Sequence, residues 1–222
     1  MVAGLILTVY GEESSLAIEA LESLFRTQDY PIQLVIVATN VTEAAVNRLK
    51  KHSQTKYYRL LTFAGKKSLT FCLNRGILYY LENFPTINYI GWIHPDMEFS
   101  KPYIATLIKR LEKDPSIGKI SPNNSRDGWQ EERQANEQCW IIPRRVFHEV
   151  GLFDENFSIG YEDWDLNRRV INAGYRCIVT PDAEVYHAGM VTRARENTTS
   201  REVMEKNAHY YMTKWGDTNA PC

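Results

Sequence analysis

The chain has 222 residues, a length that suits one sizeable domain with a substantial core better than two full domains. Lysine and arginine total 26 against 27 aspartates and glutamates, and the resulting net charge of −1 disfavours nucleic-acid binding through bulk charge. Hydrophobic residues make up 44% of the chain, but no apolar run approaches the ~18 residues of a membrane-spanning helix, so we expect no transmembrane segment.

Two near-continuous apolar runs, 5–10 and 33–39, are typical of strands that are buried on both faces of a parallel sheet. Between them, apolar residues recur with helical spacing over 17–25, and Ser14 or Ser15 can cap that helix. The first forty residues therefore predict a strand, a helix and a second strand.

The same alternation continues along the chain. Strands are expected at 57–63, 89–94 and 118–121, and helices at 42–52, 68–82 and 101–113. The second half is less regular, with a short helix from Pro143, a helix over 162–173, a strand-like segment ending at His187 and a closing helix around 201–215. The order predicts an α/β fold with a Rossmann-like, doubly wound, mostly parallel sheet, which binds ligands beyond the carboxyl ends of its strands.

The chain contains neither a GxGxxG nor a GxxxxGK[ST] phosphate-binding loop. We therefore expect other residues at those strand ends to neutralise phosphate. Asp96 and Glu98 lie two residues apart, so in an extended chain they face the same side and can hold a divalent ion. The alternative is a pair of strand-end acids that face solvent. His187 can complete a metal site begun by Asp96, although a single histidine is more often structural.

An acid-rich stretch, GYEDWD, begins the helix predicted over 162–173. Acids in a first helical turn offset the helix dipole, but three of them exceed that need. Glu162 and Asp165 are three residues apart and share one face of the helix, where neighbouring arginines can pair with them. Asp163 points about 100° away from that face, which makes it the candidate general base.

Trp140 and the four cysteines carry weaker signals. Trp140, in the sequence QCWIIP, is either a core residue or an aromatic platform for a sugar ring, and a core position is favoured. Cys72, Cys139, Cys177 and Cys222 stand singly, so they encode neither a zinc knuckle nor a dense disulfide framework. We therefore expect a reducing compartment, with the chain cytoplasmic or peripheral to a membrane.

Taken in order, these segments resemble family 2 glycosyltransferases of the GT-A fold, in particular the branch similar to rhamnosyl- and galactosyltransferases. LILTVYGEE and QLVIVATN stand at that family's first two strands, and WIHPDMEF stands at its Asp-x-Asp segment. The most specific stretch is CWIIPRRVFHEVGLFDENFSIGYEDWDLNRRVINAGYRC, followed by AEVYH. The resemblance covers nearly the whole chain.

The resemblance implies a single domain over 1–222, with a nucleotide-sugar-binding half at 1–122 and a smaller acceptor and catalytic half at 123–222. It implies an inverting, metal-assisted transfer of a sugar from a nucleotide-diphosphate donor to a glycan or other hydroxyl acceptor. By position, Asp96 and His187 match the family's ligands for Mn²⁺ or Mg²⁺, and Asp163 matches its general base.

Further positions match the family's substrate contacts around the nucleobase, the ribose, the phosphates and the sugars. Either Lys66 or Lys67 can reach phosphate. The substrate-binding residues expected in this way are Thr8, Tyr10, Glu12, Thr39, Lys66, Lys67, His94, Trp140, Glu162 and Asp165.

The sequence departs from the family's pattern at two of these positions. His94 replaces the first Asp of the metal motif. We expect it to form a hydrogen bond with ribose or phosphate and not to coordinate the ion directly. Thr39 replaces an Asp that often contacts a uracil-type base, which leaves the donor base open.

Three other functions are alternatives to this one. A pseudoenzyme that only binds a nucleotide sugar or a glycan is the main alternative, because of His94. A sugar-1-phosphate nucleotidyltransferase would need a basic glycine-rich loop where the chain has the acidic TVYGEESS, and a methyltransferase would also need a glycine-rich first loop.

Overall fold

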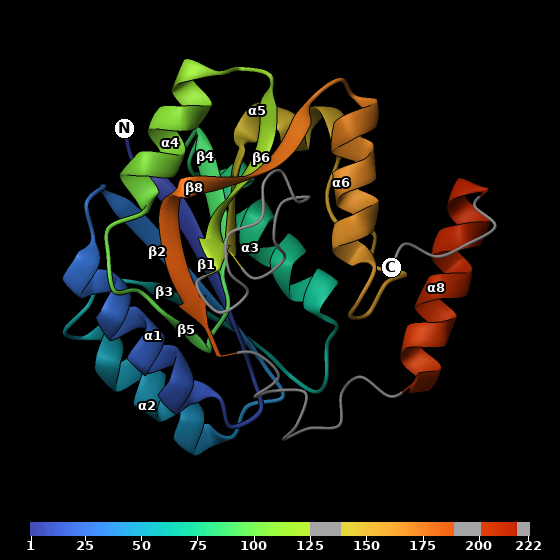
Figure 1. Cartoon of the computed structure of the whole chain (residues 1–222). Helices are drawn as coiled ribbons and strands as arrows, with labels where there is room; N and C mark the ends of the chain where they lie inside the picture. Colours follow the sequence, from blue (N-terminus) through green and yellow to red (C-terminus); the bar gives the residue numbers. More distant parts are fainter. Residues whose placement is uncertain (125–138, 189–200, 217–222) are drawn as a thin grey trace.

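The computed structural model describes residues 1–124, 139–188 and 201–216, and in these ranges the chain forms one eight-stranded sheet with helices on both faces (Figure 1). The order of the strands is β3-β2-β1-β4-β7-β6-β8-β5. The expected α/β fold with a mostly parallel sheet is confirmed. Cys222 lies outside the described residues.

The first half of the chain forms four parallel strands joined by helices, as the sequence predicts. Their apolar runs are buried on both faces, which explains why they lack polar alternation. In chain order the elements are β1 (Ala3–Tyr10), α1 (Ser14–Thr27), β2 (Ile32–Thr39), α2 (Glu43–Ser53), β3 (Arg59–Phe63), α3 (Leu69–Asn83) and β4 (Tyr89–Ile93).

The second half extends the same sheet and mixes strand directions. β7 runs antiparallel to both β4 and β6, β8 runs parallel to β6, and the short β5 runs antiparallel to β8. In chain order the elements are β5 (Met97–Glu98), α4 (Ile104–Lys113), β6 (Ile117–Asn124), β7 (Cys139–Pro143), α5 (Arg144–Val150), α6 (Glu162–Asn172), β8 (Arg176–His187) and α8 (Arg201–Trp215). The boundary that we expected at 122/123 falls within β6.

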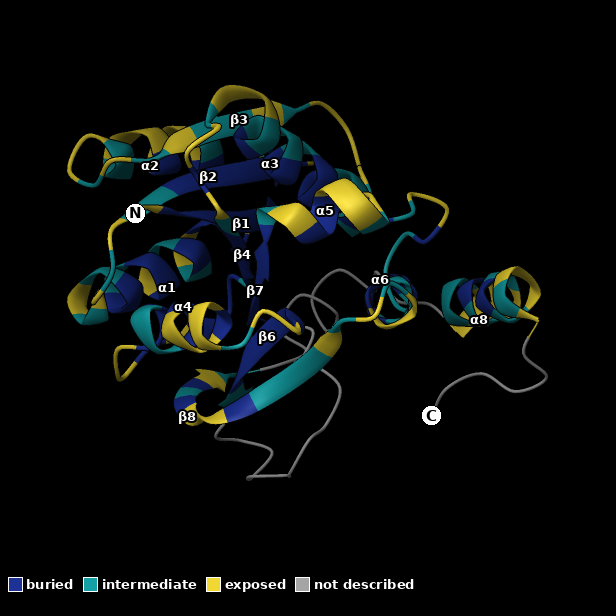
Figure 2. Cartoon of the chain, turned by 90° about the horizontal axis from the view of Figure 1, so that it is seen from above, coloured by how far each residue is buried: buried dark blue, intermediate teal, exposed yellow. Residues whose placement is uncertain are grey.

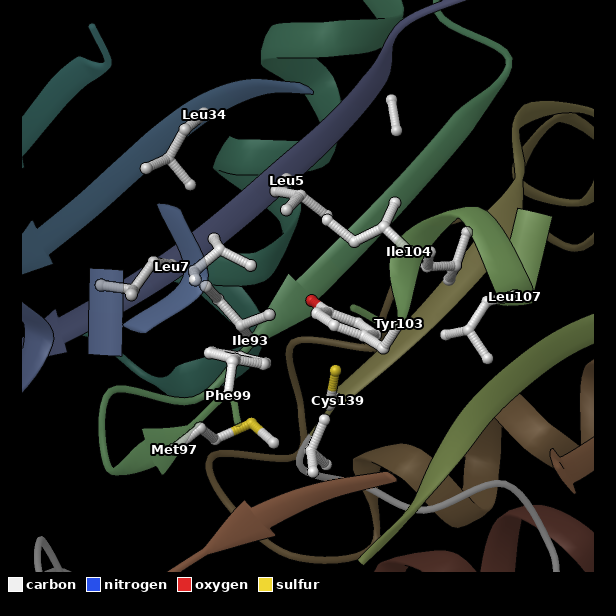
Figure 3. Close-up of a cluster of buried hydrophobic side chains, with 14 of the residues drawn as sticks. Leu5, Leu7, Leu34, Ile93, Met97, Phe99, Tyr103, Ile104, Leu107 and Cys139 are labelled. Atoms are coloured by element: carbon white, nitrogen blue, oxygen red, sulfur yellow. The ribbon is translucent and has the colours of Figure 1, made fainter. Parts of the chain in front are cut away.

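The core has two parts, one on each face of the sheet. Leu5 and Leu7 of β1 point to the face covered by α1 and α4, and they belong to the same buried cluster as Ile104 and Leu107 of α4 (Figure 3). Ile6 points to the opposite face, which α3, α5 and α6 cover. Figure 2 shows these helix layers on either side of the sheet, with α8 farther out beside α6.

Tyr80 of α3 ties the helix to the centre of the sheet. Its buried hydroxyl donates to the carbonyl oxygens of Leu5 and Gln33, at 2.7 Å each. Gly4 makes this approach possible, because a Cβ atom there would lie 2.9 Å from the Tyr80 ring. A side chain at position 4 would therefore push α3 away from β1.

Two local predictions differ from the structure. Neither Ser14 nor Ser15 caps α1, because the helix begins at Ser14 with Glu13 at the N-cap position, and Arg48 of α2 donates to both serine hydroxyls. β7 was not recognised as a strand, since five apolar residues directly before a helix carry no clear period. Within the described ranges, no helix is long and apolar enough to cross a membrane.

We predict that Tyr80→Phe lowers the free energy of unfolding by about 1 kcal/mol, since it removes a buried hydroxyl that donates to the carbonyl oxygens of Leu5 and Gln33. Tyr79→Phe is the matched control, because it removes the same hydroxyl from a half-buried ring on the same helix. Urea unfolding of the two variants measures the difference. Equal stabilities would contradict the assigned role of the Tyr80 hydroxyl.

Candidate active site

Asp96 and His187 are brought together by the pairing of β5 with β8. Met97 lies opposite His187 in this antiparallel pair, and the backbone N–H of Ala188 donates to the carbonyl oxygen of Asp96 at 3.1 Å. The connection after β4 and the end of β8 therefore meet at one edge of the sheet. His94 joins them from the residue that directly follows β4.

The three side chains converge on one carboxylate. His94 Nδ1 lies 2.5 Å and His187 Nε2 lies 2.8 Å from the same atom, Oδ1 of Asp96. The two imidazole rings stand edge to face, with centroids 5.2 Å apart. One ligand atom from each of the three residues lies within 4.8 Å of the others.

The two histidines determine the charge state of Asp96. Burial alone would raise the pKa of this carboxyl group, but hydrogen bonds and charge from His187 and His94 outweigh burial and hold the pKa well below its usual range. Asp96 is therefore an ionised, buried carboxylate at neutral pH. A buried carboxylate of this kind is stable only beside positive groups or a cation.

This residue set fits a divalent transition-metal ion. The second carboxylate oxygen of Asp96, Oδ2, is buried and has no hydrogen-bond partner among the described residues. Carboxylate oxygens suit both Mn²⁺ and Mg²⁺, whereas two imidazole ligands favour a transition-metal ion such as Mn²⁺ over Mg²⁺, which is bound mainly by oxygen. Glu98 is exposed and does not join the cluster, so the expectation that Asp96 and Glu98 share an ion site is wrong.

The acids of α6 lie in its first turn and are all buried. Glu162, Asp163 and Asp165 expose 8%, 5% and 0% of their surface. Two successive residues with positive φ, Gly160 at 85° and Tyr161 at 70°, turn the chain into this helix. Left-handed backbone at a residue with a side chain is uncommon and concentrates at functional sites, where the surroundings hold it in place.

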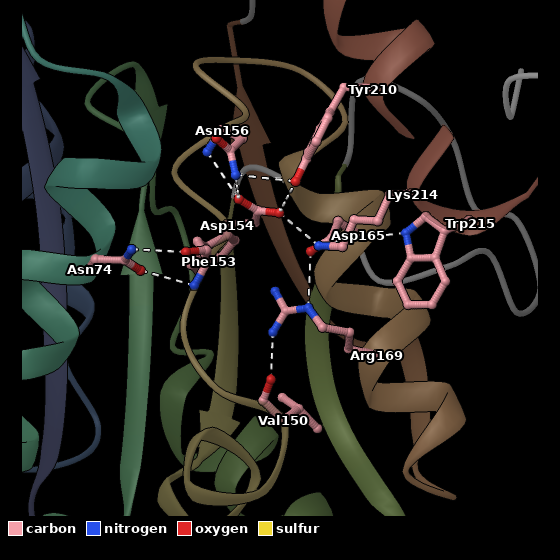
Figure 4. Close-up of polar contacts among 10 residues, drawn as sticks. All are labelled: Asn74, Val150, Phe153, Asp154, Asn156, Asp165, Arg169, Tyr210, Lys214 and Trp215. Carbon is pink, nitrogen blue, oxygen red and sulfur yellow. Dashed lines mark hydrogen bonds and ion pairs between the residues drawn. The ribbon is translucent and has the colours of Figure 1, made fainter. Parts of the chain in front are cut away.

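Asp165 anchors α6 to its surroundings (Figure 4). Its carboxylate accepts from Arg169 Nε at 2.9 Å, from Trp215 Nε1 at 3.1 Å, and pairs with Lys214 Nζ at 2.7 Å. The expected pairing with Arg169 is present, whereas Arg168 lies over the ring of Trp215. Asp165 therefore links α6 to α8 through its side chain.

Asp154 shares Lys214 with Asp165 and extends this network (Figure 4). It pairs with Lys214 Nζ at 2.7 Å and accepts from the Tyr210 hydroxyl at 2.9 Å. Burial raises its pKa, but Lys214, the backbone of Asn156 and Tyr210 outweigh burial and lower it from 3.8 to about 2. Asp154 and Asp165 therefore hold α8 against α6 and the loop before it.

The carboxyl ends of β1, β2 and β3 also meet. Thr39 is buried, and its hydroxyl donates to the Gly65 carbonyl at 2.7 Å, while the hydroxyl of Thr8 accepts from Trp92 Nε1 at 3.2 Å. Both threonines thus bind within the protein. Tyr10 is partly exposed beside them, with Lys66 Nζ 5.8 Å from the centre of its ring.

The other predicted substrate contacts are more scattered. Glu12 is exposed after β1, and Lys67 lies over the ring of Phe71. Trp140 is 2% exposed and packs among Trp92, Phe147 and Phe153, which is a core position. We therefore leave Trp140 out of the proposed site.

Sequence reasoning missed two polar side chains that shape this site. Lys119 of β6 is fully buried and donates to Asn167 of α6, and the only signal for it is a charged residue inside the apolar run IGKIS. Asn74 of α3 exchanges two hydrogen bonds with the backbone of Phe153, which fixes the loop before α6. Its place in the predicted helix over 68–82 gives no indication of this partner.

Comparison with known proteins finds distant relatives. No family profile matches the chain. It is 32% identical over 79 residues to the uncharacterised protein y4gI of Sinorhizobium fredii, and 27% identical over 94 residues to the N-acetylglucosaminyl-diphospho-decaprenol L-rhamnosyltransferase of Mycobacterium tuberculosis. These matches cover 35% and 42% of this chain, but only 9% and 29% of the relatives.

Solved structures match over nearly the whole chain. The mannosyltransferase PcManGT of Pyrobaculum calidifontis, in complex with GDP-Man and Mn²⁺, has a TM-score of 0.73 at 19% identity, over 99% of this chain and 65% of that one. TarS of S. aureus, residues 1–349 with UDP-GlcNAc, has a TM-score of 0.70 at 14% identity, over 96% of this chain and 67% of that one. The expected GT-A fold is confirmed, together with a distant sequence relationship to a rhamnosyltransferase.

We predict that Asp154→Asn lowers the free energy of unfolding by about 1 kcal/mol at pH 7, because it removes the charge that pairs with Lys214. The folded-state pKa is depressed, so the stabilisation is present above about pH 4 and is lost as the pH falls toward 2. Urea unfolding of both proteins between pH 7 and pH 2.5 should show the difference shrinking. A difference that stays constant over this range, or that Asp182→Asn on the exposed surface reproduces, would contradict the account.

Proposed function

We propose that this chain is a nucleotide-sugar-dependent glycosyltransferase that transfers a sugar to a hydroxyl acceptor with inversion at the anomeric carbon. The observation that carries the proposal is the convergence of His94, Asp96 and His187 on one point at the carboxyl edge of a GT-A sheet. The relatives support it, since one is a rhamnosyltransferase and one structural neighbour is a mannosyltransferase with GDP-Man and Mn²⁺.

The donor nucleotide is assigned to the ends of β1, β2 and β3. Tyr10 is a partly exposed aromatic ring on which a base can stack, and exposed Lys66 beside it is a cation for phosphate. The buried hydroxyls of Thr8 and Thr39 already bind within the sheet, so we assign them to the floor of this site and not to direct contacts. Glu12 and Lys67 are exposed at its margin.

A divalent cation, with Mn²⁺ favoured over Mg²⁺, would be held by His94, Asp96 and His187. When bound, such an ion offsets negative charge on a diphosphate leaving group. This assignment revises the sequence expectation for His94, because its ring nitrogen lies with the other two ligand atoms. Asp96 supplies a carboxylate that its histidine neighbours keep ionised at neutral pH.

Asp163 is assigned as the general base. Its carboxylate accepts the proton of the acceptor hydroxyl while that oxygen forms a bond to the anomeric carbon, and the bond from this carbon to the diphosphate oxygen breaks. Attack opposite the leaving group inverts the configuration. Glu162 and Asp165 shape the same helical turn, Asp165 through its contacts with Arg169, Lys214 and Trp215.

A thermal-shift screen tests donor binding directly. The protein is heated with GDP-mannose, UDP-N-acetylglucosamine and a nucleotide-activated rhamnose, each with Mn²⁺ or with EDTA, since ligands that bind the native state raise its apparent stability. Release of nucleoside diphosphate in the presence of glycan acceptors then tests transfer. Donor binding without any release would favour the pseudoenzyme, and no binding of any nucleotide sugar would contradict both functions.

We predict that Asp96→Asn weakens the binding of GDP or UDP in Mn²⁺ at least about tenfold, because it removes the one charged ligand of the cation. Glu98→Gln is the matched control, since Glu98 is an exposed acid two residues along the chain. Isothermal calorimetry in Mn²⁺ and in EDTA measures the effect. Equal nucleotide affinity of the wild-type protein under both conditions would rule out a metal-dependent donor site.

We predict that Asp163→Asn lowers the turnover number about 10²- to 10⁴-fold while donor binding persists, because the amide keeps the size of the side chain and cannot accept the proton. Glu162→Gln, on the adjacent buried acid, should act more through substrate binding or stability. NMR of the product reads the anomeric configuration. Near wild-type turnover of Asp163→Asn, or a product with the donor's configuration, would overturn the assignment of the base.

A further inference from the structure

Lys119 is a lysine enclosed in the interior of the protein. It lies in the middle of β6 between Gly118 and Ile120, and none of its surface is exposed. Burial lowers the pKa of its ammonium group, because the charged form loses the solvation of water. A cation in this position needs a compensating negative charge nearby, since an isolated buried charge is strongly unfavourable.

The compensating charges come from the first turn of α6. The ammonium of Lys119 donates to Asn167 Oδ1 at 2.8 Å. Cys177 of β8 and the negative charges of Asp163 and Glu162 oppose the effect of burial and raise the pKa of Lys119. Asn167 follows Asp163 by four residues, so the two side chains lie on the same face of α6. Lys119 is thus fixed one helical turn from the candidate base.

The other groups around Lys119 do not supply a full negative charge. Cys177 lies opposite it in β8, but burial raises the pKa of this thiol to about 11, so it is neutral at pH 7. Asp165 of the same helix pairs with Arg169 and with Lys214 of α8. From α5, the charged groups are Arg144, Arg145, His148 and Glu149, and Glu149 accepts from the Tyr175 hydroxyl.

We propose that Lys119 is a positioning residue for Asp163, whose buried ammonium, held by Asn167, compensates the adjacent charges of Asp163 and Glu162 and keeps Asp163 ionised. Two neighbouring carboxylates in a buried turn repel each other, and burial also disfavours their charged forms. A protonated Asp163 cannot accept a proton from an acceptor hydroxyl. The base role rests on the proposed function, whereas the charge coupling does not.

The coupling is measured in the substrate-free protein by NMR of ¹³C-labelled aspartate carboxyl groups, with Asp163→Asn identifying the Asp163 signal. In Lys119→Met, the midpoint of the Asp163 titration should move up by about one pH unit or more, as expected when a nearby opposite charge is removed. Lys113→Met is the matched control, because it removes an exposed lysine from α4 just before β6. An Asp163 titration that is the same in Lys119→Met and wild type would overturn the proposal.

If Lys119→Met does not fold, the reciprocal measurement on Asp163→Asn still tests the proposal. In Asp163→Asn, the Lys119 titration followed by ¹⁵N-lysine NMR should move to lower pH, because a charge that favours the ammonium form is gone. An unchanged Lys119 titration would contradict the coupling. Neither readout needs a donor or an acceptor. Absence of glycosyl transfer would therefore refute the proposed function without affecting the result on charge coupling.

Discussion

The antiparallel pairing of β5 with β8 is the contact on which the rest of the site depends. It sets Met97 against His187, so that Asp96, in the connection between β4 and β5, meets His187 at the end of β8. The Asp96 carboxylate is buried at this point, and the two histidines keep it ionised there. Without this pairing, nothing in the local sequence would bring His187 to Asp96.

The acid-rich turn of α6 is held from both sides. Toward the sheet, Lys119 of β6 contacts Asn167, and away from the sheet Asp165 contacts Lys214 and Trp215 of α8. α8 also reaches the loop that enters α6, since Asn207 donates to the carbonyl oxygens of Ile159 and Gly160. These contacts connect the start of α6 to β6 and α8, and such support is what precise placement of a reacting carboxylate requires.

The sequence was sufficient for the first half of the fold, because runs such as LILTVY and QLVIVAT have the length and composition of buried parallel strands. The sequence did not predict β7, because its five residues have no distinctive period. It also did not predict the start of α1, because Arg48 of another helix binds the hydroxyls of Ser14 and Ser15.

For the site, the sequence predicted that Asp96 and His187 lie together, but it did not predict the other contacts of the candidate residues. Asp96 and His187 were paired by type, whereas Glu98 was assigned to the same face from spacing alone and is exposed. The contacts of Lys119 and of Lys214 join elements that are distant in the sequence. Helical and strand periodicities say nothing about such contacts, so only the folded chain reveals them.

The central claim is that His94, Asp96 and His187 form one centre that binds a divalent cation together with the donor nucleotide. Crystals grown with Mn²⁺ and either GDP or UDP, with diffraction data collected at the manganese absorption edge, test it directly. The account predicts one anomalous peak in contact with Asp96 and both histidines, beside the diphosphate. A nucleotide bound with no manganese at these three side chains would contradict it.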